Sequence, residues 1–379
     1  MKKHDLSRRG FLGGAVAVGA VGALGCGPDT GPGGGSAGET AAKDGLPITI
    51  AGYKNERVAA FADGRAGIEG CRVTFEPDKI GNLNTHVFEG PATRQATEIG
   101  LHPFMLAYAR AGFRDYALLP VFPLRTFRQK SIFIRTDRGI ETPEDLRGKK
   151  IGTPGYSSTS LTWIRGLLEE EYGVKPTDVE WVVSRADSSA RDSGGPSEFE
   201  NTIPEGLPIT EGPEGVDESE LLVEGHVDAL FHAIKPRAIV EGHPGVGTLF
   251  PDTRATEQDY YARTGIFPIM HAVAIQRAAV EEHPWLVRAV FDGYYQAKRL
   301  AYAQMAGTRS LLDTLPWYAE ELEATQALMG ADFYSYGMTE ANRKTLETFF
   351  RYSHQQGFTE RELTIEDLFE PTSLDLVEA

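Results

Sequence analysis

Short apolar runs alternate with longer amphipathic stretches along most of the chain. Residues 46–51 alternate and are rich in β-branched side chains, which predicts an opening strand that ends at Gly52 and Tyr53. Further apolar runs predict strands at residues 71–75, 96–101, 116–122, 131–135, 150–152, 179–183, 227–231 and 266–275. Because predicted helices separate these strands, the pattern indicates an α/β protein with open, largely parallel sheets.

The clearest helix in the middle of the chain is predicted at residues 157–172. Hydroxyl side chains stand at its start, apolar residues recur at helical spacing, and Gly173 follows its end. Residues 184–218 are polar and rich in glycine and proline, which predicts an irregular surface excursion. From residue 281 to residue 369 the pattern is mostly helical.

The first residues resemble an export signal. Arg8 and Arg9 precede a weakly apolar run at residues 13–24, which is too short and too glycine-rich to span a bilayer permanently. Residues 1–26 are therefore predicted to be a twin-arginine signal peptide, although a buried N-terminal helix is the alternative. Cys26 ends a stretch similar to the site where bacterial lipoproteins are cleaved and lipidated. Residues 27–45 predict a flexible linker.

The amino-acid composition limits the kinds of molecule that the protein is expected to bind. The formal net charge is −16, which argues against nucleic acid. Cys26 and Cys71 are the two cysteines, so an intrachain disulfide is not expected, and no CxxC or HExxH spacing predicts a metal site. We predict no cofactor and no metal from the motifs, and a metal site formed only in three dimensions stays open. The folded part is predicted to work outside the cytoplasm, tethered to the membrane by a lipid on Cys26.

Candidate ligand-binding residues gather at the ends of predicted strands, where open α/β sheets bind ligands. They are Tyr53, His102, Arg125, Arg128, Tyr156, Ser157, Ser158, Thr159, His232 and His271. Two arginines suit a carboxylate, and hydroxyls with free helical N–H groups suit an anion. Each also has a structural alternative: the hydroxyls as helix caps, the arginines in surface ion pairs, the aromatic rings in packing between lobes, and the histidines as hydrogen-bonded core residues.

Several ordered motifs resemble the 4,5-dihydroxyphthalate decarboxylase family over about residues 48–369. They are PVFPLRTFR at 120–128, TWIRGLL at 162–168, EYGVKP at 171–176, TGIFPIMH at 264–271 and LMG at 328–330. The resemblance implies the type 2 periplasmic-binding-protein fold, with two Rossmann-like lobes, a ligand cleft between them and a helical C-terminal extension. Lobe 1 is expected at residues 46–148 plus 265–379, and lobe 2 at residues 149–264.

The chain departs from the family pattern at two positions. Gln129 stands where the family tends to carry a histidine, and Gly155 stands where it tends to carry a glutamate. A decarboxylase must stabilise or protonate the carbanion that remains as CO₂ leaves, so these changes weaken the case for that chemistry.

The sequence therefore leaves two functions open. The first is an extracytoplasmic solute-binding protein that captures a small, aromatic carboxylate between its lobes and presents it to a membrane transporter permease. The alternative is a cofactor-independent decarboxylase of a hydroxylated aromatic acid, in which Arg125 and Arg128 hold carboxylates and His271 or His232 donates a proton. A structural or protein-interaction module has only the acidic surface in its favour.

Overall fold

The computed structural model describes residues 45–307 and 314–378. The expected signal peptide, Cys26 and residues 27–44 of the expected linker lie outside the described residues. Among the helices in the described ranges, none combines the length and the apolar character that crossing a bilayer requires.

The first sheet has five strands in the order β2-β1-β3-β11-β4. Their bounds are β1 (Leu46–Gly52), β2 (Cys71–Pro77), β3 (Ala96–Gly100), β4 (Tyr116–Arg125) and β11 (Ile269–Gln276). β1 pairs in parallel with β2 and β3, whereas β11 lies antiparallel between β3 and β4. β4 is apolar and buried along nearly its whole length because it is covered on both faces.

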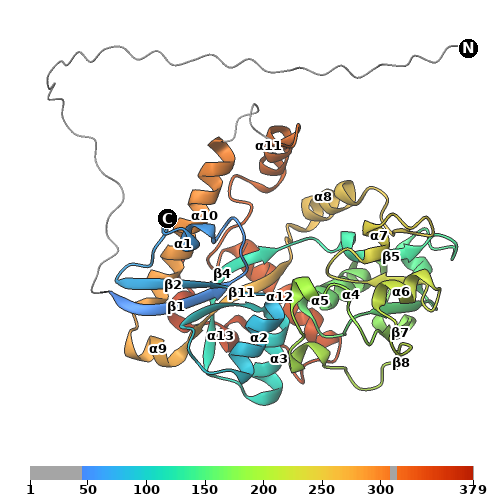
Figure 1. Cartoon of the computed structure of the whole chain (residues 1–379), viewed down its shortest axis with the longest axis horizontal. Helices are drawn as coiled ribbons and strands as arrows, with labels where there is room; N and C mark the ends of the chain where they lie inside the picture. Colours follow the sequence, from blue (N-terminus) through green and yellow to red (C-terminus); the bar gives the residue numbers. More distant parts are fainter. Residues whose placement is uncertain (1–44, 308–313, 379) are drawn as a thin grey trace, which may run out of the picture. The chain divides into compact units, whose positions relative to one another are not determined.

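The second sheet has six strands in the order β10-β5-β9-β6-β7-β8. Their bounds are β5 (Ile132–Arg135), β6 (Lys150–Thr153), β7 (Glu180–Val183), β8 (Ile209–Glu211), β9 (Ala229–Phe231) and β10 (Val246–Thr248). The four strands β9, β6, β7 and β8 are parallel, and β5 and β10 complete the sheet by antiparallel pairing. Figure 1 shows the first sheet in blue to cyan, with β11 joining it late in the chain, and the second sheet in green to yellow.

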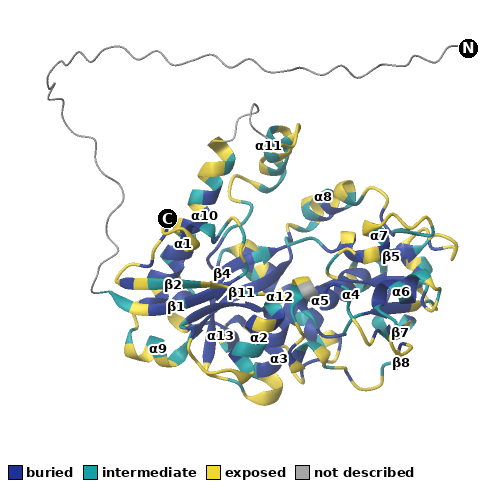
Figure 2. Ribbon diagram, in the orientation of Figure 1, coloured by how far each residue is buried: buried dark blue, intermediate teal, exposed yellow. Residues whose placement is uncertain are grey.

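Helices cover both sheets. The α-helices are α1 (Ala59–Ala62), α2 (Ile80–Glu89), α3 (Leu101–Ala111), α4 (Thr159–Tyr172), α5 (Ala190–Ser193), α6 (Glu218–Val223), α7 (Arg237–Val240), α8 (Thr253–Thr264), α9 (Arg277–Glu282), α10 (Leu286–Gly307), α11 (Tyr318–Met329), α12 (Glu340–Gln355) and α13 (Ile365–Leu368). Short 3-10 helices are η1 (Gln129–Ser131), η2 (Pro143–Leu146), η3 (Pro176–Asp178), η4 (Glu198–Asn201) and η5 (Pro371–Ser373). In Figure 2 the inner strands of both sheets are buried, whereas α8 and α11 are mostly intermediate or exposed.

The helix predicted at residues 157–172 forms as α4. It begins at Thr159 because Ser158 is the N-cap, whose side chain accepts a hydrogen bond from the Leu161 N–H. Gly173 ends the helix with a φ of 65°, a left-handed conformation that glycine adopts without strain.

Helix α4 joins the hydrophobic cores of the two sheets. Trp163 and Leu167 belong to the core around the first sheet, whereas Ile164 and Leu168 belong to the core around the second. The C-terminal helix α12 packs on α4 at Gly166, where an added Cβ would lie 2.1 Å from the Tyr352 ring. The two sheets are therefore connected by a continuous apolar packing as well as by the chain crossovers.

The chain passes from the first sheet to the second between β4 and β5. The expected boundary of lobe 1 at residue 148 would place residues 132–135 with the first sheet, but β5 belongs to the second sheet, where it pairs with β9 and β10. The chain thus leaves the first sheet after Arg125. The C-terminal helices contact both halves of the fold, since α10 contacts β4 and α12 packs on α4.

Candidate functional site

A cavity of about 440 Å³ lies between the two sheets and takes its walls from both. This volume falls within the range of roughly 300–1,000 Å³ in which proteins hold small ligands. Six of the ten predicted ligand-binding residues line the cavity: Tyr53, Arg128, Ser158, Thr159, His232 and His271. The other four, His102, Arg125, Tyr156 and Ser157, are not among its lining residues.

A buried acid–base pair stands at the first-sheet side of the cavity. His271 Nδ1 lies 2.6 Å from Glu98 Oε1, and the other oxygen of Glu98 accepts a 2.9 Å hydrogen bond from the Tyr53 N–H. In the β3–β11 register His271 faces Gly100 and Val273 faces Glu98, so the two side chains are diagonal neighbours on one face. The Tyr53 ring lies 5.5 Å from the imidazole, centroid to centroid.

Sequence reasoning missed Glu98. The signal was present, because a carboxylate stands within the apolar run predicted as a buried strand, and only about 1% of Glu98 is exposed. A buried carboxylate needs a hydrogen-bonding or cationic partner. Here the Tyr53 N–H and His271 together supply it.

Arg128 is a buried cation on the cavity wall. Its Nη1 donates to the Ala233 carbonyl at 3.1 Å and to Ser131 Oγ at 3.3 Å, and its Nε and Nη2 both point at Met270 Sδ. Within the described residues it forms no ion pair. Burial lowers the pKa of Arg128 to about 9, because the charged form has lost its water without gaining a close carboxylate.

The start of α4 adds a second feature that suits an anion. Ser158, Thr159 and Ser160 line the cavity. The N–H groups of the first helical turn have no carbonyl four residues earlier to bond to, and the helix dipole is positive at this end. The Ser158 hydroxyl caps the helix and the Thr159 hydroxyl accepts from the His102 N–H, so these two side chains also have structural roles.

Arg125 does not line the cavity and instead forms hydrogen bonds to the C-terminal part of the chain. Its Nη2 donates to the Ser335 carbonyl at 3.0 Å and to Asn342 Oδ1, and its backbone exchanges hydrogen bonds with the Tyr334 hydroxyl. Burial lowers its pKa to about 10. The structure therefore does not bring the two predicted arginines together, because Arg125 reaches neutral acceptors outside the cavity.

His102, Tyr156 and Ser157 form part of a buried network where α3 meets the start of α4. His102 Nδ1 donates to the Ser157 carbonyl at 2.5 Å, and Nε2 accepts from Ser353 Oγ at 2.9 Å. Burial lowers the pKa of His102 to about 3, so this histidine is neutral. The Tyr156 ring packs on Arg165 and Trp181. These contacts favour the structural alternatives for His102 and Tyr156, whereas the Ser157 hydroxyl donates to the Phe199 carbonyl instead of capping α4.

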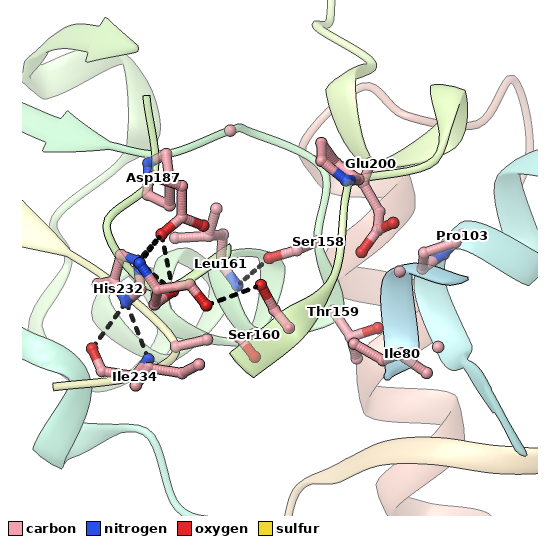
Figure 3. A pocket seen from close by; sticks show the side chains of 18 of the residues that line it. Ile80, Pro103, Ser158, Thr159, Ser160, Leu161, Asp187, Glu200, His232 and Ile234 are labelled. Carbon is pink, nitrogen blue, oxygen red and sulfur yellow. Dashed lines mark hydrogen bonds and ion pairs between the residues drawn. The ribbon is translucent and has the colours of Figure 1, made fainter. Parts of the chain in front are cut away.

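The segment expected to be a surface excursion helps to enclose the cavity. Asp187, Ser189 and Glu200 line it, together with backbone near Gly194. Figure 3 shows Asp187 and His232 facing each other on one side, with Glu200, Ile80 and Pro103 on the opposite side. Gly155 also lines the cavity, so Glu200 supplies a carboxylate to a wall where the chain lacks the glutamate implied by the family pattern.

Comparison with known proteins shows to which family the chain belongs. A 4,5-dihydroxyphthalate decarboxylase from Comamonas testosteroni is 34% identical over 330 residues, which cover 87% of this chain and 98% of the relative. The chain belongs to the 4,5-dihydroxyphthalate decarboxylase family. A relative of the same name from Pseudomonas putida is 33% identical over 216 residues, covering 57% of this chain and 81% of the relative. A family model described as NMT1/THI5 like matches residues 113–193.

Solved structures show the fold. The periplasmic aliphatic sulphonate binding protein SsuA from Escherichia coli superimposes with a TM-score of 0.50 at 13% identity, covering 86% of this chain and 97% of SsuA. The periplasmic sulfonate-binding protein SsuA from Methylobacillus flagellatus KT gives 0.53 at 14% identity, covering 88% and 94%. The predicted type 2 periplasmic-binding-protein fold is confirmed.

Proposed function

We propose that this protein captures a small aromatic carboxylate in the cavity between its two sheets. The observation that carries the proposal is Arg128, a buried guanidinium on the cavity wall that has no carboxylate partner in the described part of the chain. Its Nε and Nη2 contact only the Met270 sulfur, a weak acceptor, so the oxygens of a bound carboxylate would make stronger, bidentate hydrogen bonds.

The walls of the cavity support an aromatic ligand. Ile80, Pro103, Leu124 and Leu161 provide apolar surface, and the Tyr53 ring lies beside His271. A flat ring would bury its faces against such walls, while its carboxylate reaches Arg128 and the start of α4. Asp187 and Glu200 are acceptors for hydroxyl groups elsewhere on the ring.

We place this activity outside the cytoplasm. Arg8 and Arg9 support export by the twin-arginine route, Cys26 supports a lipid anchor, and the fold is one that periplasmic binding proteins share. A tethered protein that captures a carboxylate would present it to a transporter permease in the same membrane.

Decarboxylation of a hydroxylated aromatic acid is the second candidate, and the Glu98–His271 pair favours it. Loss of CO₂ leaves its bonding electrons on the ring carbon, which must then take a proton. His271 is positioned to supply that proton from Nε2, with Glu98 balancing the charge of the imidazolium. The net change is one carboxylate and one proton converted to CO₂ and a C–H bond. The names of the relatives in this family agree with that reaction.

One experiment separates the two functions. Purified protein is screened by thermal shift against aromatic mono- and dicarboxylates with and without ring hydroxyls, and each ligand that stabilises it is then assayed for CO₂ release. Stabilisation without CO₂ supports the solute-binding function, and CO₂ release that His271→Gln abolishes supports the lyase. If no carboxylate stabilises the protein at millimolar concentration, the proposal is wrong.

A further inference from the structure

Three side chains from separate segments meet beside the cavity. Asp187 belongs to the irregular segment after β7, Glu218 is the first residue of α6, and His232 follows β9. One oxygen or nitrogen atom from each lies within 4.8 Å of the corresponding atoms of the other two. Asp187 and His232 also line the cavity, and Figure 3 shows their side chains pointing toward each other there.

This cluster holds two carboxylates and one imidazole, so negative charge is in excess. Glu218 is 0% exposed, and its oxygens accept hydrogen bonds from the N–H and hydroxyl of Ser188. Among the side chains that the structure describes, no lysine or arginine forms an ion pair with Glu218. The nearby Asp187 is a second carboxylate, half-buried, whose ion-pair contact is His232 at 3.4 Å. Two adjacent carboxylates that have lost water repel each other unless a cation lies between them.

The orientation of His232 fits a metal ligand. Nδ1 accepts a hydrogen bond from the Ile234 N–H at 2.9 Å and lies 2.7 Å from the Ile234 carbonyl oxygen, so the backbone fixes the orientation of the ring. Nε2 then faces Asp187 Oδ1 and Ser189 Oγ, at 3.4 and 3.5 Å. A ring that the backbone holds at one nitrogen presents its other nitrogen to the carboxylates in a fixed position, and a metal ion that binds there takes the place of the Nε2 proton.

We propose that Asp187, Glu218 and His232 bind a divalent first-row transition-metal ion, with Zn²⁺ the best fit. Two carboxylates and one imidazole suit zinc better than magnesium or calcium, which prefer oxygen ligands throughout. Three protein ligands leave one coordination position of the metal open. Because Asp187 and His232 line the cavity, this open position would face the small molecule bound there. The proposed metal site shares Asp187 with the ligand cavity, but metal binding is tested without any carboxylate.

The test measures metal binding directly. The full protein is stripped with a chelator, titrated with Zn²⁺ by calorimetry, and its metal content is determined after gel filtration. We expect one equivalent in the wild type and at least a tenfold loss of affinity, roughly the lower bound for disturbing a metal site, in Glu218→Gln and in His232→Gln. Co²⁺ in place of Zn²⁺ should give visible absorption bands that both variants lose.

The matched control is His226→Gln. His226 pairs with Glu224 on the surface just after α6, so this pair offers two potential metal ligands but lacks the third that the cluster has. It should bind zinc like the wild type, and so should Arg128→Gln, which is expected to weaken carboxylate binding alone. If Glu218→Gln does not fold, Asp187→Asn on the irregular segment replaces it. A wild type that retains no zinc, or cluster variants with wild-type affinity, would overturn the proposal.

Discussion

Glu98 and His271 form a buried hydrogen-bonded pair across two neighbouring strands, with 2.6 Å between Oε1 and Nδ1. The strands are far apart in the chain, since β3 ends at Gly100 and β11 begins at Ile269. The pair joins the chain's early and late contributions to the first sheet at the wall of the cavity. A change to this pair is therefore expected to alter both the stability of the fold and the chemistry of the cavity.

Removal of the histidine from this pair should strongly destabilise the protein. His271→Ala leaves the buried Glu98 carboxylate without its partner, and breaking a buried pair in this way costs roughly 3–5 kcal/mol. Urea denaturation measures the free energy of unfolding. The double variant Glu98→Gln/His271→Ala should lose less than the sum of the two single variants, since it leaves no unpaired charge. Strict additivity would contradict the coupling.

The two arginines of the 120–128 motif should behave differently. Arg128→Gln removes the cation from the cavity wall and should weaken carboxylate binding by about 2 kcal/mol or more, roughly thirtyfold. Arg125→Gln is the matched control, because this arginine bonds Ser335 and Asn342 outside the cavity. It should lower thermal stability and leave affinity nearly unchanged. Calorimetric titration of both variants checks the prediction, and equal losses of affinity would contradict it.

Acid should destabilise the protein through His102. Its pKa is about 3 in the folded protein and its ordinary value is 6.5, so the unfolded chain binds more protons between these pH values. Stability is then fully present above about pH 6.5 and falls as the pH drops toward 3, by up to about 1.4 kcal/mol per pH unit from this one group. His102→Gln should be less stable at neutral pH and show a shallower slope. Chemical denaturation at several pH values measures it, and parallel slopes would refute this origin.

The irregular segment at residues 184–218 should respond to changes on α2. A Cβ added at Gly81 would lie 2.0 Å from the Gly195 carbonyl oxygen, so Gly81→Ala must push this segment away from the helix. Strain of this kind costs typically 1–3 kcal/mol, and we expect ligand affinity to fall by about tenfold as the cavity opens. Gly195→Ala is the control, because its Cβ would meet no atom within 4 Å. Equal affinity in both variants would show that the segment does not enclose the ligand.

Sequence periodicity determined the kinds of element and much of their order. The alternation at residues 46–51 and the capped pattern at 157–172 are local signals, and β1 and α4 formed where those signals stand. Motif order also indicated the family and the fold, because the matched stretches extend along nearly the whole chain. The sequence did not indicate which sheet β5 joins, because a four-residue apolar strand carries no information about its pairing partners.

For the site, sequence alone identified Tyr53, Arg128 and His271 by their positions beside predicted strands. It could not separate Arg128 from Arg125, three residues apart in one motif, because only the packed fold decides which guanidinium faces the cavity. It also missed Glu98, Asp187 and Glu218, since their partners are supplied by strands and loops distant in the chain. Local propensity acts over a few residues, whereas the pairing of buried charges depends on tertiary contacts that no local pattern encodes.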